Sequence, residues 1–247
     1  HEVVVTGGGA VGAACARELA VGGHRPLVVD AGTPGSAWQA AGGMLAPQIE
    51  ADGQDPLFDL GLAARERYQT LAEELLAETG IDIGLWQDGI ARVAADESQV
   101  PELKSKVAWQ RQQGYLCDWL DAAEVREHWP WIGEMYGALW ARRDGALDPA
   151  RLVEALLADA TRLGARVVRD AAQRVECTGD RVTAVIGAER YPAEQVVVAA
   201  GAWSGRLGGI PRPLTVEPVR GQMVALPWPA GIERAILYNR DGYVLAR

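Results

Sequence analysis

Three glycines at a fixed spacing are the first residues of this chain that could do chemistry. Gly7, Gly9 and Gly12 form the pattern G-x-G-x-x-G between the apolar run Val3–Val5 and a helical stretch that begins near Val11. In such a turn the first glycine allows the tight bend, the second lets the backbone approach a pyrophosphate, and the third lets the helix pack on the strand. The free N–H groups of the helix N-terminus attract phosphates. The pattern predicts a dinucleotide site.

An acidic residue stands where such a site needs one. Asp30 ends a second run, Arg25–Asp30, and follows Gly12 by 18 residues. A carboxylate at about this distance binds the ribose hydroxyls in dinucleotide-binding folds. Adenosine diphosphate is common to NAD and FAD, so these residues do not choose between the two cofactors. A glycine-rich turn without a ligand is the alternative interpretation.

Composition excludes several classes of function. The 247 residues carry a formal net charge of −9, which argues against nucleic acid or an anionic membrane as a partner. No apolar stretch of the sequence is long enough to span a membrane, and we expect no signal peptide before the first strand. The three cysteines are scattered, which indicates reduced core thiols in a cytoplasmic protein. The three histidines lie apart, so we expect no metal site and no catalytic triad.

The order of elements predicts an α/β protein with a Rossmann-like domain. A loop is expected over 35–47, a hairpin over 83–93 with its turn at Asp88-Gly89, and strands alternating with turns over 214–247, one of them carrying Arg220. Helices are expected over 57–78, 100–113, 121–128 and 149–164, and strands over 137–141, 166–169, 182–186 and 195–199. Strands therefore return after a group of helices, which indicates one domain inserted into another.

Several motifs together resemble the D-amino-acid-oxidase-like family of FAD-dependent oxidoreductases, and within it the glycine oxidases of thiamin biosynthesis. The most specific motif is the string Ala-Ala-Gly-Gly-Met-Leu-Ala-Pro at 40–47. The others lie at 144–149, 197–204, 218–222 and 242–247. The resemblance implies FAD as the cofactor, and it implies that the late strand at 195–199 returns beside the first strand. An ordinary buried strand with a glycine exit is the alternative for that segment.

The resemblance also implies roles for individual residues. The loop at 40–44 would run along the ribityl chain and the flavin, and the backbone of Val175 would face the adenine. Tyr243 would donate a hydrogen bond to the substrate carboxylate, although a cross-strand aromatic is the alternative, and for Arg220 a structural ion pair is preferred. The residues expected at the cofactor are Gly7, Gly9, Ala10, Val11, Gly12, Asp30, Ala31, Ala40, Ala41, Gly42, Gly43, Met44, Val175, Ala200, Gly201 and Trp203.

The implied reaction is the oxidation of a small amino acid such as glycine or sarcosine. Hydride would pass to the flavin and dioxygen would be reduced to hydrogen peroxide, in a protein that could form homo-oligomers. A dehydrogenase of D-amino acids with a quinone acceptor, and a flavin-binding fragment without turnover, are the alternatives. The expected FAD-binding domain is 1–84 plus 145–206, and the expected substrate-binding domain is 85–144 plus 207–247, built on an antiparallel or mixed sheet. Because members of the family continue beyond Arg247, we expect this second domain to be incomplete.

Overall fold

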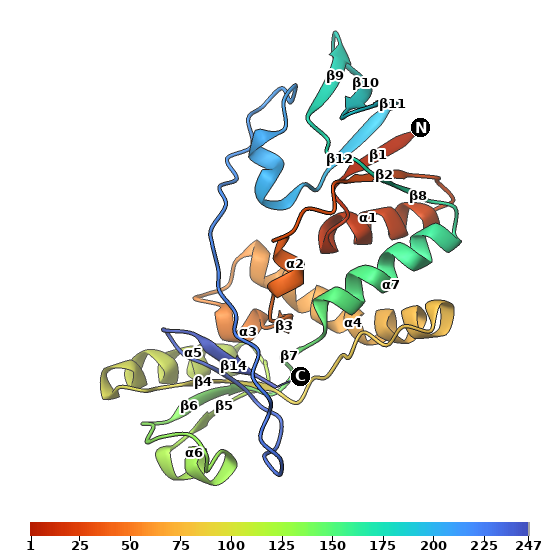
Figure 1. Ribbon diagram of the computed structural model, residues 1–247. Helices are drawn as coiled ribbons and strands as arrows, with labels where there is room; N and C mark the ends of the chain where they lie inside the picture. The colour runs from red at the N-terminus through yellow and green to blue at the C-terminus, as the bar shows by residue number, and fades with distance from the viewer. Residues whose placement is uncertain (247) are drawn as a thin grey trace. The chain divides into compact units, whose positions relative to one another are not determined.

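The computed structural model describes residues 1–246, which divide into two compact units. Unit 1 contains His1–Ala41, Glu73–Ile83 and Pro149–Val224, and unit 2 contains Gly42–Ala72, Gly84–Asp148 and the residues from Ala225 onward. Each unit is therefore assembled from three separated segments of the chain, drawn in different colours in Figure 1. The expected FAD-binding domain included residues 42–72, which here belong to unit 2.

Unit 1 is built on a parallel sheet of four strands. Its order is β12-β1-β2-β8, with β12 at Gln195–Val198, β1 at Val3–Thr6, β2 at Leu27–Asp30 and β8 at Arg166–Arg169. The strand β12 pairs with β1, as the resemblance implied, in the register Val4 to Val196. All four residues of β1 are buried, because layers cover the sheet on both faces, and this explains the continuous apolar run.

Helices cover one face of this sheet and a small sheet covers the other (Figure 1). The helices α1 (Ala10–Val21) and α7 (Pro149–Arg162) pack on Val5 and Val28 through small residues such as Ala16 and Ala160. On the opposite face, Val185 packs against Val4 and Val29. It belongs to an antiparallel sheet made of β9 (Arg174–Thr178), β10 (Arg181–Ile186) and β11 (Arg190–Pro192).

Unit 2 is built on a mixed sheet of five strands. Its order is β14-β13-β4-β6-β5, with β14 at Tyr243–Leu245, β13 at Ile236–Tyr238, β4 at Ile90–Val93, β6 at Ala138–Ala141 and β5 at Cys117–Leu120. Only β13 and β4 pair in parallel; the other neighbours are antiparallel. With the parallel sheet of unit 1, this confirms the predicted α/β fold class.

Different elements pack on the two faces of the five-stranded sheet. On one face, Ile90, Leu139 and Ile236 pack against Ile49 of α3 (Pro47–Glu50) and Leu103 of α5 (Val100–Gln112). The other face, which carries Trp140 of β6, is covered by Val125 of α6 (Ala122–His128) and by Trp129 and Trp131. The N-terminus of α6 is stabilised by a capping box in which Asp121 and Glu124 each accept a backbone N–H.

The remaining elements are short, apart from one long helix. The helix α4 (Pro56–Thr79) begins in unit 2, and its residues from Glu73 belong to unit 1. The short elements are α2 (Ala37–Ala40), β3 (Met44–Leu45), η1 (Glu97–Gln99), β7 (Gly145–Ala146) and η2 (Gly201–Arg206). Within residues 1–246, no helix is both long and apolar enough to cross a membrane.

Three local expectations were wrong. The segment 83–93 is not a hairpin, because Trp86 pairs with Ala146 while β4 lies between β13 and β6. The segment 35–47 is not a plain loop, since it contains α2, β3 and the first residue of α3. Residues 213–229 form neither helix nor strand and are almost entirely exposed, so Arg220 lies on no strand. For the hairpin and for residues 213–229, the presence of a partner strand, and not the local pattern, decides whether a ladder forms.

Candidate functional site

The turn between β1 and α1 is shaped by two glycines that pack against backbone. Gly7 has a φ of +98°, and a Cβ atom there would lie 2.4 Å from the carbonyl oxygen of Ala199, just beyond β12. A Cβ atom on Gly12 would lie 1.9 Å from the carbonyl oxygen of Gly7. Both positions therefore require glycine so that the strand, the helix and the end of β12 can approach one another.

Gly9 differs from these two glycines because no backbone occupies the space beside it. Its φ of −72° and ψ of −174° suit any residue, and a Cβ atom there would meet only the ring of Trp38, at 3.3 Å. Gly9 is the N-cap of α1, which has no side-chain cap and no acidic residue in its first turn. A helix N-terminus left open in this way offers N–H groups and a positive dipole end to an anion. The turn therefore fits a pyrophosphate.

Asp30 lies at the same turn, as the spacing predicted. Its Cγ and Oδ2 atoms are 3.3 Å from the position of a Cβ atom on Gly8. The side chain is half-buried, and within residues 1–246 its carboxylate has no hydrogen-bond or ion-pair partner. Two acceptor oxygens beside the phosphate turn suit the hydroxyls of a ribose. The following residue, Ala31, is also half-buried.

Trp38 is a residue of this site that the sequence interpretation missed. It lies on α2, and its indole Nε1 is 3.8 Å from the position of a Cβ atom on Gly9. The indole N–H has no hydrogen-bond partner in the described part of the chain. It could therefore donate to a ligand bound over the turn. No local signal indicated this contact, because Trp38 follows the second strand in a segment of small residues.

The segment after β12 supplies further predicted residues of unit 1. Ala200 precedes η2, and Gly201 begins it with a φ of +54°. No atom lies within 4 Å of a Cβ position on Gly201, and the side chain of Trp203 is exposed. The helix residues Ala10 and Val11 are half-buried and exposed, respectively. The predicted residues at the ends of β1, β2 and β12 are thus brought to one edge of the parallel sheet, at the carboxyl ends of its strands.

Val175 lies on β9, in the small antiparallel sheet, and its backbone already has partners. Its N–H donates to the carbonyl oxygen of Gly208 at 2.8 Å. A Cβ atom on Gly209 would lie 1.9 Å from the carbonyl oxygen of Val175. The backbone of Val175 therefore packs on residues 208–209, and an adenine contact there remains a prediction.

The predicted flavin loop is divided between the units. Ala40 and Ala41 end unit 1, and Gly42 begins unit 2. In unit 2, Met44 pairs with Ala146 across β3 and β7, and the carbonyl oxygen of Gly43 accepts a hydrogen bond from Leu147 at 3.0 Å.

Tyr243, at the start of β14, lies beside this loop. Its hydroxyl oxygen is 2.6 Å from the position that a Cβ atom on Gly42 would occupy. The structure thus brings together two residues, 201 positions apart in the sequence, that were predicted to contact flavin and substrate.

A buried polar network follows directly after the loop in unit 2, and the sequence interpretation missed it. Oδ1 of Asp144 accepts a hydrogen bond from Nη1 of Arg65 at 2.6 Å, and both side chains are almost fully buried. Gln48 and Gln110 complete the network with reciprocal hydrogen bonds. A signal existed: Arg65 falls between Leu62 and Tyr68 at the spacing of the apolar side of α4.

Burial dominates the electrostatics of this network. Desolvation raises the pKa of Asp144 to about 6, although the Arg65 guanidinium and the N–H groups of Gln48 and Ile49 favour its charged form. Burial also raises the pKa of the nearby Cys117 thiol to about 12. Cys117 is therefore an inert core thiol, whereas Cys177 is exposed and does not fit the predicted core position.

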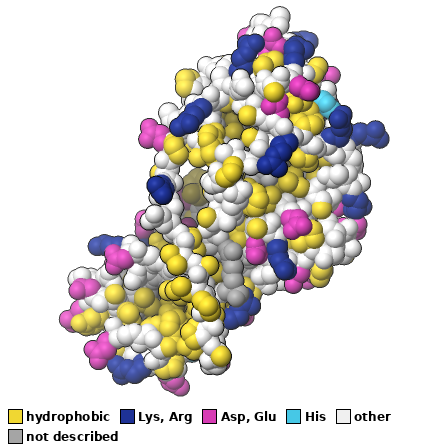
Figure 2. Space-filling model, viewed as in Figure 1, with side chains coloured by type: hydrophobic (Ala, Val, Ile, Leu, Met, Phe, Trp, Pro, Cys, Tyr) yellow, Lys and Arg dark blue, Asp and Glu magenta, His cyan; other side chains and the backbone are white. Residues whose placement is uncertain are grey.

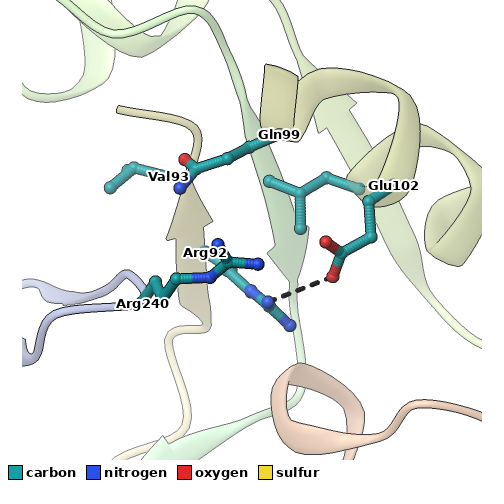
Figure 3. Close-up of a pocket in the computed structure, with 6 residues that line it drawn as sticks. Arg92, Val93, Gln99, Glu102 and Arg240 are labelled. Atoms are coloured by element: carbon teal, nitrogen blue, oxygen red, sulfur yellow. Dashed lines mark hydrogen bonds and ion pairs between the residues drawn. The ribbon is translucent and has the colours of Figure 1, made fainter. Parts of the chain in front are cut away.

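Unit 2 contains two hollows. The first is lined by Arg92, Glu102 and Arg240 and has room for about one water molecule, at 10 Å³; the Arg92–Glu102 ion pair crosses it (Figure 3). The second, of about 220 Å³, is mostly apolar and is lined by Trp131, Met135 and Leu237 together with Gly242 and Tyr243. The second hollow therefore reaches the predicted substrate residue Tyr243, whereas the first does not.

Figure 2 shows acidic and basic side chains interspersed over the visible face, with hydrophobic side chains between them. Among residues 1–246, no three His, Cys, Asp or Glu side chains are grouped so that they could hold a metal ion.

Comparisons with known proteins agree with this geometry. The family model described as FAD dependent oxidoreductase matches residues 2–246. The chain is 34% identical to the glycine oxidase of Geobacillus kaustophilus, covering 98% of this chain and 66% of that protein. It is 32% identical to the bifunctional protein ThiO/ThiG of Synechocystis, covering 100% of this chain and 37% of that protein. The crystal structure of glycine oxidase from Bacillus cereus superposes with a TM-score of 0.89 at 28% identity, covering 100% of this chain and 68% of that one.

Proposed function

The chain belongs to the family of FAD-dependent oxidoreductases, and we propose that it serves the oxidation of glycine or another small primary or secondary amino acid. The observation that carries the proposal is the similarity to glycine oxidase along the whole chain, in sequence and in fold. This chain spans slightly less than two thirds of the Geobacillus enzyme, so the activity of the whole protein is part of the proposal.

The cofactor, FAD, is held in this proposal by the edge of the parallel sheet in unit 1. The N–H groups at the start of α1 and the bare backbone at Gly9 bind the pyrophosphate. The carboxylate of Asp30, which has no partner among residues 1–246, accepts hydrogen bonds from the ribose. The indole N–H of Trp38 is a further donor beside the same turn. Gly7 and Gly12 act indirectly, because they allow the close packing that forms the turn.

The loop at 42–44 and Tyr243 are assigned to the flavin and the substrate. When bound, FAD supplies the oxidising chemistry by accepting a hydride from the α-carbon of the amine. The protein then has to orient the substrate and keep its amine neutral. We assign Tyr243 to the substrate carboxylate, because its hydroxyl lies beside Gly42 and can donate a hydrogen bond to an anion. Dioxygen is the proposed acceptor, with hydrogen peroxide and an imino acid as products.

The relative named ThiO/ThiG supports a role in thiamin biosynthesis. The imino acid derived from glycine would then be used in the thiazole branch of that route. A quinone acceptor in place of dioxygen remains the alternative. The two acceptors are distinguished by whether hydrogen peroxide is formed in air.

The test uses the protein expressed from its complete reading frame and purified with its flavin. In the absence of oxygen, glycine or sarcosine should bleach the flavin absorption. In air, one molecule of hydrogen peroxide should form for each molecule of imino acid. Bleaching by glycine without peroxide in air would favour the dehydrogenase alternative. A flavin that is reduced only by bulky D-amino acids would contradict the proposed substrate class.

A further inference from the structure

One short stretch of chain holds the residues that follow Gly42 at several points. Oδ2 of Asp144 accepts hydrogen bonds from the backbone N–H groups of Gln48, at 3.1 Å, and Ile49, at 3.0 Å, in the first turn of α3. Directly after Asp144, β7 pairs with β3, and the N–H of Leu147 donates to the carbonyl oxygen of Gly43. Residues 144–147 therefore hold the segment 43–49 at both of its ends.

The buried charge of Asp144 is compensated by a buried counterion, Arg65. Nη1 of Arg65 lies 2.6 Å from Oδ1 of Asp144 and 2.6 Å from Oε1 of Gln48. The Arg65 side chain is 4% exposed and that of Asp144 is 0% exposed. Nε2 of Gln48 in turn donates to Gln110 and to the carbonyl oxygen of Leu116. In the described residues this network contains no buried side-chain polar atom without a partner.

A buried ion pair of this kind adds little net stability, because desolvating two charges costs about as much as their attraction returns. What it does provide is a single permitted geometry, since any displacement of α3 would leave a charge buried without its partners. The segment so restrained is the one that leads directly out of the loop assigned to the flavin.

We propose that Asp144 and Arg65 are positioning residues, which hold the segment 43–49 so that Gly42 and Gly43 keep one arrangement beside the flavin. The inference rests on the proposed function. In this proposal neither side chain touches the substrate or the cofactor. Both side chains act through the backbone of the loop.

Unit 1 contains a matched control for this pair. Arg17 on α1 and Asp159 on α7 also form a buried ion pair, at 2.8 Å, with side-chain exposures of 7% and 1%. The further partners of Arg17 are Glu18 and Glu74, and that of Asp159 is Arg162. This pair has the same chemistry but no hydrogen bond to the segment 43–49.

The experiment compares wild-type protein with Asp144→Asn, Arg65→Lys and Asp159→Asn, each from the complete reading frame and loaded with FAD. We expect Asp144→Asn to accelerate hydrogen exchange of the Gln48 and Ile49 amides about tenfold or more, because their acceptor is weakened. The absorption maximum of the bound flavin should shift, while the dissociation constant of FAD stays unchanged, because the phosphate turn belongs to unit 1. Arg65→Lys should produce the same changes in weaker form. Asp159→Asn should leave exchange at 43–49 and the flavin spectrum as in the wild type.

Unchanged exchange and an unchanged spectrum in Asp144→Asn and Arg65→Lys would overturn the positioning role, and so would equal changes in Asp159→Asn. If Asp144→Asn does not fold, Arg65→Lys decides between these outcomes. A wild-type protein that binds FAD but whose flavin is reduced by neither glycine nor sarcosine would instead overturn the proposed function. In that event the exchange comparison, repeated on protein stripped of FAD, still decides whether the pair holds the segment.

Discussion

The hydroxyl oxygen of Tyr243 lies 2.6 Å from the position that a Cβ atom on Gly42 would occupy. Gly42 is buried at the start of unit 2, and Tyr243 begins β14 at the edge of the five-stranded sheet. The absence of a side chain at residue 42 is therefore what allows the tyrosine to lie against the loop assigned to the flavin.

Gly42→Ala should displace Tyr243. The new methyl group would also lie 2.8 Å from Cε2 of the Tyr243 ring, so the ring must move away from the loop. We expect the KM for glycine to rise about tenfold or more, because a small misplacement of a positioning group has large effects. Overpacking should also lower the free energy of unfolding by about 1–3 kcal/mol. Gly53→Ala is the control, since no atom lies within 4 Å of its Cβ position. A wild-type KM in a folded Gly42→Ala variant would argue against this contact.

Tyr243→Phe should weaken substrate binding without disturbing the fold. Loss of one hydrogen bond to a charged group costs about 1.5–3 kcal/mol, which corresponds to roughly ten- to a hundredfold in affinity. Steady-state kinetics with glycine measure the effect, and thermal unfolding should give the wild-type midpoint. Tyr136→Phe, at an exposed tyrosine of the same unit, serves as the control. If Tyr243→Phe leaves both KM and kcat unchanged, the tyrosine is a packing residue.

Gly9→Ala and Gly12→Ala should separate ligand binding from folding. A methyl group on Gly9 meets only Trp38, so we expect normal stability but at least about tenfold weaker FAD binding, equivalent to about 1.4 kcal/mol. A methyl group on Gly12 would overlap the carbonyl group of Gly7, so that variant should unfold more easily with or without FAD. Titration of FAD into stripped protein and denaturant unfolding measure the two effects. Wild-type FAD affinity in Gly9→Ala would exclude the turn as the phosphate site.

Asp144 should make the stability of the protein depend on pH in a defined direction. Its pKa in the folded protein is about 6, above the usual 3.8, so the folded state binds more protons in this interval. The resulting stabilisation is fully present below pH 3.8 and is lost as the pH rises through 6. The difference between these two pKa values corresponds to a stabilisation of the folded state of roughly 3 kcal/mol. Urea unfolding of the wild type and Asp144→Asn should therefore show the wild type gaining stability relative to the variant as the pH falls from about 7 to 4. A relative loss of stability over this range would contradict the direction of the pKa change.

The elements that depend on nearby residues were predictable from the sequence. The run Val3–Val5, the glycine spacing after it and Asp30 predicted the strand, the turn and the acid of the proposed phosphate site, because all of these residues lie within about thirty residues of chain. The helix at 122–128 was equally accessible, since Asp121 and Glu124 satisfy its first N–H groups locally. The return of the strand at 195–198 to the side of β1 required the resemblance to a family, because no local pattern encodes a strand's partner.

Only the tertiary structure decided which distant groups meet. Trp86 pairs with Ala146 instead of forming a hairpin, and Arg65 meets Asp144 across 79 residues. The same holds for Tyr243 beside Gly42 and for Trp38 beside Gly9. Sheet hydrogen bonds and buried ion pairs depend on which surfaces the folded chain brings together and shields from water. The sequence by itself therefore determined the types and local spacing of the chemical groups, and the tertiary packing determined their partners, because desolvation and pairing arise only when the separated segments close on one another.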